Sequence, residues 1–486
     1  MLIDLNNYPA SGNTSGYDAC ICGGGAAGIT LAIKLGAAGK RVALFETGGL
    51  EYTMEAQKIA DGESKGMTYW GLQYCRLRFL GGSSNHWTGR SKPFDEIDFA
   101  ERDFFDLPGW PIPKKELDRY LEAAKQVLDI KGDFTAPEIP DWKSDLFISD
   151  PFADSPPTKF GPKYLATMKS SKNIDLFINA TLTDILLDPD LTDVSDIVVK
   201  NYKQEPFHFT GKTVTLATGG IENARLLLSS SSQVKEGIGN SSDFVGRCFM
   251  EHFQTDLGHF VGNMKYWSVG DSIGLYTTPK FSLENKIGNS NITFHLTSSP
   301  EVGGARSAPA RKFIRDNICH SDALTKISRK FVDFACPGDG TIGSLIEQAP
   351  NRESRITLND DKDFFGMRRI NIHWIMNEMD RRTIRTTALA AAREFARLNY
   401  GRVQLPRHIL DEDREINTYY HCHHMGTTRM SATPEYGVVD KNCKVFGINN
   451  LYVAGSSVFS TSGGCNPTFP IVQMSLRLAD HLASKL

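Results

Sequence analysis

A glycine motif near the N-terminus has the spacing of a phosphate-binding turn. Gly23, Gly25 and Gly28 follow an apolar segment and precede a stretch with helical periodicity. In such a turn the first glycine permits a tight bend, the second lets the backbone approach a pyrophosphate, and the third lets helix and strand pack closely. The helix N-terminus then faces the phosphates, and the carboxylate of Glu46 can accept hydrogen bonds from a ribose. The motif predicts a dinucleotide site. The carboxylate disfavours NADP, whose 2′-phosphate it would repel, and leaves FAD and NAD open.

Three imidazoles and a thiol lie together in the segment 421–424, which reads His-Cys-His-His. Histidine can take up or release a proton near neutral pH because its ordinary pKa is about 6.5. The same residues, completed by Cys443 or Cys465, are also ligand types that bind zinc. Consecutive side chains point in different directions, so at most two of the four share a face. We therefore expect no metal site here.

The elements expected around the glycine motif form a βαβ unit. Apolar runs predict strands at 17–22 and 41–46, and helical spacing predicts a helix at about 29–35. The unit has the size, roughly 30 residues, of a mononucleotide-binding half. Two further strand–helix pairs are expected in the same domain: a strand at 213–218 with a helix at about 222–228, and a strand at 451–454 with a helix at about 470–486.

The spread of these segments predicts a domain that is discontinuous in sequence. We expect an α/β fold, α+β overall, whose Rossmann-like dinucleotide-binding domain comprises residues 1–100, 160–260 and 405–486. Alternating apolar and polar residues, as in 369–375, predict a mainly antiparallel sheet within 260–400, with a helix at about 380–398. This sheet and its helices would form a substrate-binding domain from residues 100–160 and 260–405.

Composition excludes several classes of protein. The 486 residues carry 54 Lys and Arg against 57 Asp and Glu, so the basic excess of a nucleic-acid-binding protein is missing. No apolar run reaches the roughly 18 residues that a membrane helix needs. The nine cysteines include no CxxC pair, and the N-terminus lacks the basic region of a secretory signal. We therefore expect reduced thiols in a cytoplasmic protein.

Further motifs follow one another along nearly the whole chain. They are Arg78–Trp87, Leu216–Arg225, Val245–His252, His423–Thr427, Gly437–Asp440, Val445–Gly447, Asn450–Val453 and Asn466–Thr468. In their sequences and in their order they resemble the glucose–methanol–choline (GMC) family of flavin oxidoreductases. The pair His86-Trp87 and the short length look closest to pyranose oxidases and to bacterial sugar or gluconate dehydrogenases.

The resemblance implies that the glycine motif binds FAD rather than NAD. It places the flavin ring at the Gly81–Gly82 loop and the adenine end at the segment 180–182. The residues expected to contact FAD are Gly23, Gly25, Ala26, Ala27, Gly28, Glu46, Gly81, Gly82, Ser83, Asn85, His86, Thr181, Ala217, Gly455, Ser456, Asn466, Pro467 and Thr468. His86 occupies the offset at which some relatives attach flavin covalently, whereas other similar dehydrogenases carry the same residue without a bond. Both alternatives stay open.

The resemblance also assigns catalytic roles. His423, three residues before Gly426, would take the proton of a substrate hydroxyl, and Asn466 would orient the substrate oxygen. The implied reaction is oxidation of a sugar, glycoside or polyol hydroxyl to a carbonyl, with hydride transfer to flavin N5 and reoxidation by oxygen or another acceptor. Alternatives are a non-oxidative lyase of the same fold, a noncatalytic flavin-binding protein and an NAD-dependent dehydrogenase. Trp87, Tyr69 and Trp70 are candidates to line the substrate cavity.

Overall fold

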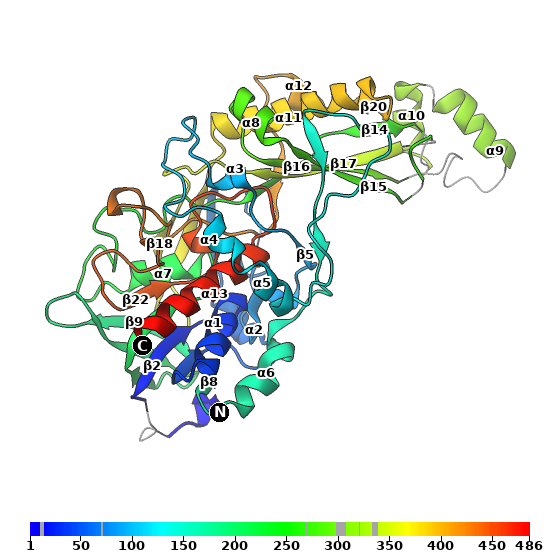
Figure 1. The fold of residues 1–486 in the computed structure, drawn as a ribbon. Helices are drawn as coiled ribbons and strands as arrows, with labels where there is room; N and C mark the ends of the chain where they lie inside the picture. The colour runs from blue at the N-terminus through cyan, green and yellow to red at the C-terminus, as the bar shows by residue number, and fades with distance from the viewer. Residues whose placement is uncertain are drawn as a thin grey trace.

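The computed structural model describes residues 1–9, 14–69, 71–263, 265–268, 270–297, 308–319, 321–332 and 339–486. Two large sheets organise these residues (Figure 1). One lies with helices α1 and α13 in the lower part of the view, and the other lies beside helix α11 at the top.

The first sheet is six-stranded, and all of its pairings are parallel. In spatial order its strands are β1 (Leu2–Asp4), β8 (Ile174–Ile178), β3 (Val42–Phe45), β2 (Tyr17–Cys22), β12 (Gly211–Leu216) and β22 (Leu451–Val453). The predicted strands of the βαβ unit and the two later ones are confirmed, whereas β1 and β8 were not predicted. The strands come from the beginning, the middle and the end of the chain, as expected of a discontinuous Rossmann-like sheet.

Helices α1 (Ala26–Ala37) and α13 (Thr468–Lys485) pack against each other beside this sheet. Ile29, Leu31 and Leu35 of α1 are fully buried and point to more than one side of the helix, so α1 is enclosed rather than covered on a single face. A Cβ on Gly28 would lie 1.9 Å from the carbonyl oxygen of Gly23. Only glycine therefore allows the helix to start this close to the strand, as the motif predicted.

The second sheet is antiparallel, as predicted for the stretch 260–400. The stretch 369–375 lies instead in a separate three-stranded sheet, where its strand pairs antiparallel with one neighbour and parallel with the other. Its main path runs β20 (Gly401–Gln404), β14 (His259–Gly262), β17 (Asp339–Glu347), β16 (Ser290–Leu296), β15 (Ser272–Thr277) and β6 (Phe147–Ser149), and β13 (His252–Thr255) joins β17 to β21 (Thr418–Tyr420). Helix α11 (Glu378–Arg397) confirms the predicted helix. It begins with reciprocal capping, in which Asn377 and Asp380 each accept the other's backbone N–H.

The remaining strands form small sheets, and short helices connect them. The strands are β4 (Gly62–Gly66), β5 (Arg90–Ser91), β7 (Ala153–Asp154), β9 (Thr181–Leu187), β10 (Val194–Lys200), β11 (Pro206–Phe209), β18 (Arg355–Lys362) and β19 (Arg368–Trp374). The α-helices are α2 (Met54–Lys58), α3 (Glu96–Phe99), α4 (Lys115–Asp118), α5 (Leu121–Val127), α6 (Phe160–Ser170), α7 (Glu222–Ser229), α8 (Pro279–Asn285), α9 (Ala308–Phe313), α10 (Asp322–Ser328) and α12 (Arg407–Leu410). The 3-10 turns are η1 (Leu5–Asn7), η2 (Gly82–Asn85), η4 (Pro434–Tyr436) and η5 (Ser456–Val458), and η3 (Ile314–Ile318) is a π-turn.

One sequence-based expectation about the cysteines is wrong. Among the residues that the structure describes, the cysteines at positions 20, 22, 75, 248, 422, 443 and 465 form no disulfide, but Cys319 is disulfide-bonded. The odd count and the absence of a CxxC pair do not report spatial proximity, so they could not reveal this bond.

Candidate active site

A cavity of about 590 Å³ opens at the carboxyl edge of the parallel sheet. Its wall includes the residues that directly follow β2, β3 and β12, and Gly455, which lies two residues after β22. The carboxyl ends of parallel strands are where open α/β sheets bind ligands, because the loops there diverge and leave a crevice. On another side the cavity is lined by the segment 421–424, so the glycine motif and the histidine cluster face one space.

The glycine turn presents free backbone to this cavity. A Cβ built on Gly25 would meet no atom within 4 Å, and Gly25 has an ordinary extended conformation with φ −90°. Gly25 is the N-cap of α1 and contributes no side-chain cap, so the first N–H groups of the helix are available to an anion. Gly23, by contrast, has φ +115°, and its Cβ would lie 2.4 Å from the carbonyl oxygen of Ala217. The turn is therefore shaped by Gly23 and left open to a ligand at Gly25.

Glu46 holds the same turn from the end of β3. Its two carboxylate oxygens accept the backbone N–H groups of Gly24 and Gly48, both at 2.9 Å. Burial raises the pKa of this carboxyl group, and those hydrogen bonds oppose the rise. Each carboxylate oxygen can accept more than one hydrogen bond, so Glu46 still has acceptor capacity toward the cavity that it lines.

Thr181 carries an unpaired hydroxyl close to Glu46, whose backbone carbonyl accepts the N–H of Ala180 at 2.9 Å. It lies in the cavity lining between Ala180 and Leu182, and the residue is 4% exposed. Among the residues that the structure describes, its Oγ1 is buried without a hydrogen-bond partner. Because a buried hydroxyl without a partner is costly, this group fits a site that a polar ligand completes.

The loop expected at the flavin ring is tied directly to the glycine turn. Gly81 donates its N–H to the carbonyl oxygen of Gly24 at 2.7 Å, and it has φ +99°. Asn85 donates its side-chain N–H groups to the carbonyls of Leu80 and Gly82. Asn85 and Gly81 thus shape the loop without lining the cavity, and Gly28 likewise lies outside the lining. The other residues expected to contact FAD all line it: Gly23, Gly25, Ala26, Ala27, Glu46, Gly82, Ser83, His86, Thr181, Ala217, Gly455, Ser456, Asn466, Pro467 and Thr468.

His423 and His424 both line the cavity but have different surroundings. The Oη of Tyr69 donates to the Glu251 carboxylate and lies 2.8 Å from Nε2 of His424, which therefore donates to Tyr69. His423 instead contacts His252, with 2.8 Å between the two Nδ1 atoms. Within the described part of the chain, Nε2 of His423 has no hydrogen-bond partner. Nε2 of His423 is thus free to accept a proton, whereas Nε2 of His424 is engaged in the buried hydrogen bonds with Tyr69 and Glu251.

Burial lowers the pKa of His423 well below its usual value, and the neighbouring His252, His421 and His424 lower it further. At neutral pH the imidazole is therefore uncharged and has a lone pair with which to accept a proton.

Asn466 lies on the same wall, just before α13. Its Nδ2 donates one hydrogen to the carbonyl oxygen of Arg90 at 2.9 Å. An amide nitrogen carries two hydrogens, so the second remains available to a substrate oxygen. The contact with Arg90 fixes the orientation of the amide.

The cavity wall also contains buried arginine–carboxylate pairs, which the sequence motifs did not predict. Arg76 and Arg78 pair with Glu222 at 2.8 and 2.7 Å, and Arg225 pairs with Asp363 at 2.7 Å. The arginines hold the pKa of Glu222 well below its usual range despite burial. The sequence could have indicated Glu222 and Arg225, because both belong to the motif Leu216–Arg225 and their spacing of three residues places them on one face of a helix. No motif indicated Asp363.

Two of the candidate aromatic residues can be placed. Trp87 lines the cavity and donates its indole N–H to the carbonyl of Thr158 at 3.0 Å. Tyr69 is buried in the core and does not line the cavity. Trp70 lies outside the described residues.

The described residues provide neither a metal site nor a membrane-spanning helix. Over those ranges, no three or more His, Cys, Asp or Glu side chains are grouped so that they could hold a metal ion. Over the same ranges, no helix combines the length and apolar character needed to cross a bilayer.

The chain is similar to several known proteins. Residues 350–475 match the family model described as GMC oxidoreductase. The chain is 23% identical to the 2-methyl-1,2-propanediol dehydrogenase of Mycolicibacterium austroafricanum, over 96% of this chain and 95% of that protein. It is 25% identical to the fructose dehydrogenase large subunit of Gluconobacter japonicus, over 57% of this chain and 48% of that subunit. The solved structure of pyridoxine 4-oxidase from Mesorbium loti has a TM-score of 0.61 at 16% identity, covering 96% of this chain and 99% of that one.

A glycine turn at the carboxyl edge of a parallel sheet, facing an imidazole across one cavity, suits an oxidoreductase that binds a dinucleotide. The match over residues 350–475 and the relatives show that the chain resembles GMC oxidoreductases and is itself an oxidoreductase. The resemblance seen in the sequence motifs and the mixed α/β fold are both confirmed.

Proposed function

We propose that the protein oxidises a hydroxyl group of a sugar, glycoside or polyol to a carbonyl, with FAD as its cofactor. The observation that carries the proposal is that His423 and Asn466 share the wall of the cavity into which the glycine turn opens. FAD bound there would supply the acceptor for the hydride that leaves the substrate carbon.

The residues that would hold FAD each offer a matching group. The N–H groups at the start of α1 bind the pyrophosphate, Glu46 accepts ribose hydroxyls, and the unpaired hydroxyl of Thr181 binds near the adenine end. In this proposal the FAD-binding domain comprises 1–100, 160–260 and 405–486, and the substrate-binding domain comprises 100–160 and 260–405. Strands β4, β13 and β21 cross this division, because they pair into sheets of the second domain.

His423 acts as the general base. Its free Nε2 takes the proton of the substrate hydroxyl, and the lowered pKa keeps this nitrogen unprotonated at neutral pH. Asn466 donates its second amide hydrogen to the same substrate oxygen and so fixes the angle at which the hydroxyl meets the base. An amide suits this role because it does not compete for the proton.

The substrate class is supported by the charge of the wall and by the relatives. The arginines that line the cavity are paired with carboxylates, so the wall suits a neutral molecule rich in hydroxyl groups. The relatives include a dehydrogenase of a diol and a subunit of a dehydrogenase of a sugar. Oxygen or another acceptor would then reoxidise the cofactor.

His86 is proposed as the residue beside the flavin ring. It follows the η2 turn on the cavity wall, and burial lowers its pKa, so the imidazole is uncharged and nucleophilic. The position of His86 agrees with a covalent bond from its imidazole to the flavin and equally with a noncovalent contact. Acid precipitation of the protein distinguishes them.

The test is anaerobic reduction of the flavin by a panel of sugars, glycosides and polyols. His423→Ala is expected to slow reduction about 10²- to 10⁴-fold with FAD still bound, the usual contribution of a general base. Asn466→Ala is expected to slow it roughly ten- to hundredfold, as for a lost hydrogen bond. His424→Gln is the control, because an amide nitrogen can still donate to Tyr69.

Two outcomes contradict the proposal. If flavin reduction were slow in His424→Gln and nearly normal in His423→Ala, the general base would be His424 rather than His423. A substrate that is converted without bleaching the flavin would favour the lyase alternative, in which His423 acts only as an acid and base.

A further inference from the structure

His252 is the immediate neighbour of the proposed base and is completely buried. It is the first residue of β13, and its ring stands nearly perpendicular to that of His423, at 86° with 5.1 Å between centroids. Its Nδ1 lies 2.8 Å from Nδ1 of His423. Its Nε2 lies 3.1 and 2.8 Å from the carbonyl oxygens of Ser462 and Gly463.

These contacts fix where the ring hydrogens are. Carbonyl oxygens only accept hydrogen bonds, so Nε2 of His252 must carry the hydrogen. A neutral imidazole has one N–H, so Nδ1 of His252 is then a bare acceptor. The hydrogen in the contact between the two Nδ1 atoms must therefore belong to His423, which leaves Nε2 of His423 bare.

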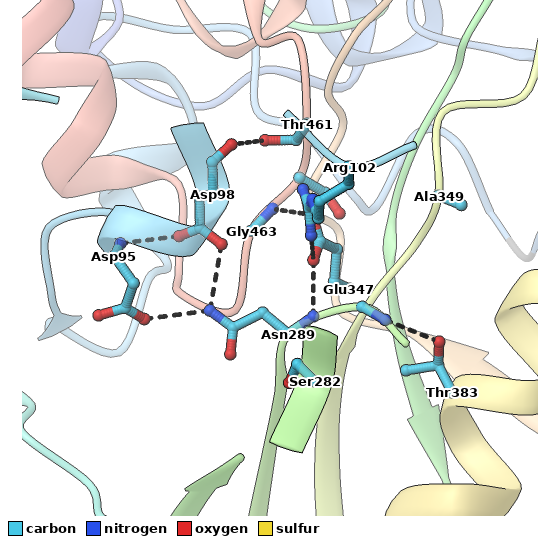
Figure 2. Close-up of polar contacts among 12 residues, drawn as sticks. Asp95, Asp98, Arg102, Ser282, Asn289, Glu347, Ala349, Thr383, Thr461 and Gly463 are labelled. Carbon is cyan, nitrogen blue, oxygen red and sulfur yellow. Dashed lines mark hydrogen bonds and ion pairs between the residues drawn. The ribbon is translucent and has the colours of Figure 1, made fainter. Parts of the chain in front are cut away.

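The carbonyls that impose this arrangement are themselves held firmly (Figure 2). The N–H of Gly463 donates to Glu347 at 3.3 Å, and Arg102 pairs with both oxygens of Glu347 at 2.6 and 2.8 Å. Thr461 donates to the backbone carbonyl of Asp98 at 3.0 Å. Because the Arg102–Glu347 pair is almost fully buried, the loop that faces His252 has little freedom to turn its carbonyls away.

We propose that His252 is a positioning residue that selects the Nδ1–H tautomer of His423, so that Nε2 is the proton acceptor of the reaction. This inference rests on the proposed function, because it assigns the atom of His423 that takes the substrate proton. It adds a residue that touches neither substrate nor cofactor. Its contribution is to keep the lone pair of the base directed away from His252.

The arrangement also suits the protonated state. When Nε2 of His423 accepts a proton, its Nδ1–H still donates to His252, and the hydrogen bond becomes charge-assisted. The titratable neighbours of His423 are His252 on β13 and His421 and His424 on its own segment, and its backbone N–H donates to the carboxylate of Glu251. Burial lowers the pKa of His252 to about 3, so His252 does not capture the proton itself.

Two amide substitutions at His252 separate its contact with His423 from its contacts with the loop carbonyls. In His252→Asn the amide oxygen takes the place of Nδ1 and can accept from His423. In His252→Gln the amide nitrogen takes the place of Nε2 and donates to the loop carbonyls, but nothing accepts from His423. We expect His252→Gln to lower kcat about ten- to hundredfold with KM little changed, and His252→Asn to recover most of that loss. His295→Gln, at an exposed histidine bonded to Ser272, is the control and should behave as wild type.

The tautomer itself is read from ¹⁵N NMR of the histidine-labelled holoenzyme, with signals assigned from the His252 and His423 variants. We expect His423 protonated at Nδ1 and His252 protonated at Nε2 in wild type, and a mixed tautomer of His423 in His252→Gln. An Nε2–H tautomer of His423 in wild type would overturn the inference, as would equal kcat in the two amide variants. This readout does not depend on turnover, so it separates failure of the tautomer assignment from failure of the proposed function.

Discussion

Gly25 offers the sharpest separation between folding and cofactor binding. Gly25→Val places a side chain where no atom lies within 4 Å of the new Cβ, on a backbone whose φ of −90° suits any residue. The folded protein should therefore lose only the small difference between glycine and valine at an N-cap, roughly 0.5–1 kcal/mol. The same side chain occupies the space that the pyrophosphate needs. Losing two charge-assisted hydrogen bonds to phosphate costs about 3–6 kcal/mol, or roughly 10²- to 10⁴-fold in Kd.

The assay has two parts. Purified Gly25→Val should be colourless and should bind added FAD at least about a hundredfold more weakly than wild-type apoprotein, measured by titration calorimetry. Its free energy of unfolding in urea should match that of wild-type apoprotein within about 1 kcal/mol. Gly132→Ala, whose Cβ would make an ordinary 3.8 Å contact with Ala153, is the control and should bind FAD normally. FAD binding by Gly25→Val with wild-type affinity would refute the reasoning, because the phosphates would then lie elsewhere.

Four further outcomes are expected. Thr181→Val should keep or raise the stability of the apoprotein, since it removes an unpaired buried hydroxyl, but should weaken FAD binding about tenfold by calorimetry. If the flavin is covalently bound, wild-type protein precipitated with acid should stay yellow and His86→Ala should release its colour; release from wild type would show a noncovalent cofactor. Arg102→Met should lower the free energy of unfolding by about 3–5 kcal/mol because it leaves a buried carboxylate uncompensated, whereas Lys280→Met, at an exposed pair, should leave it unchanged. Flavin reduction should fall with decreasing pH only below the ordinary histidine pKa of about 6.5, because the lowered pKa keeps His423 unprotonated until then, and His423→Ala should lack this limb.

The sequence predicted those parts of the fold that depend on local patterns. The strand, glycine turn and helix around Gly25 were predicted because each is specified by neighbouring residues, and the same holds for α11, whose cap pairs Asn377 with Asp380. Strands β1 and β8 were missed. β1 has only three residues, too few to show a periodicity, and its partner β8 lies far along the chain.

The site was predictable only where a motif carried it. His423 and Asn466 were named from the family resemblance, and both lie on the cavity wall. His252 lies in a quoted motif, but its contact with His423 spans 171 residues of sequence. Likewise, Asp363 pairs with Arg225 from the distant turn between β18 and β19. Such contacts depend on how the sheets pack, which residue types and spacing do not encode.

The order of strands in the parallel sheet has a consequence for how the protein is made. The glycine turn follows β2, one of the first strands to be synthesised, whereas the neighbouring wall of the cavity follows β22, one of the last. On the ribosome, almost the entire chain must therefore be synthesised before α13 can pack against α1. Cofactor insertion should accordingly follow translation rather than accompany it. During that interval apolar side chains of α1 are exposed, which makes the nascent chain a client for chaperones and makes flavin supply a determinant of its yield.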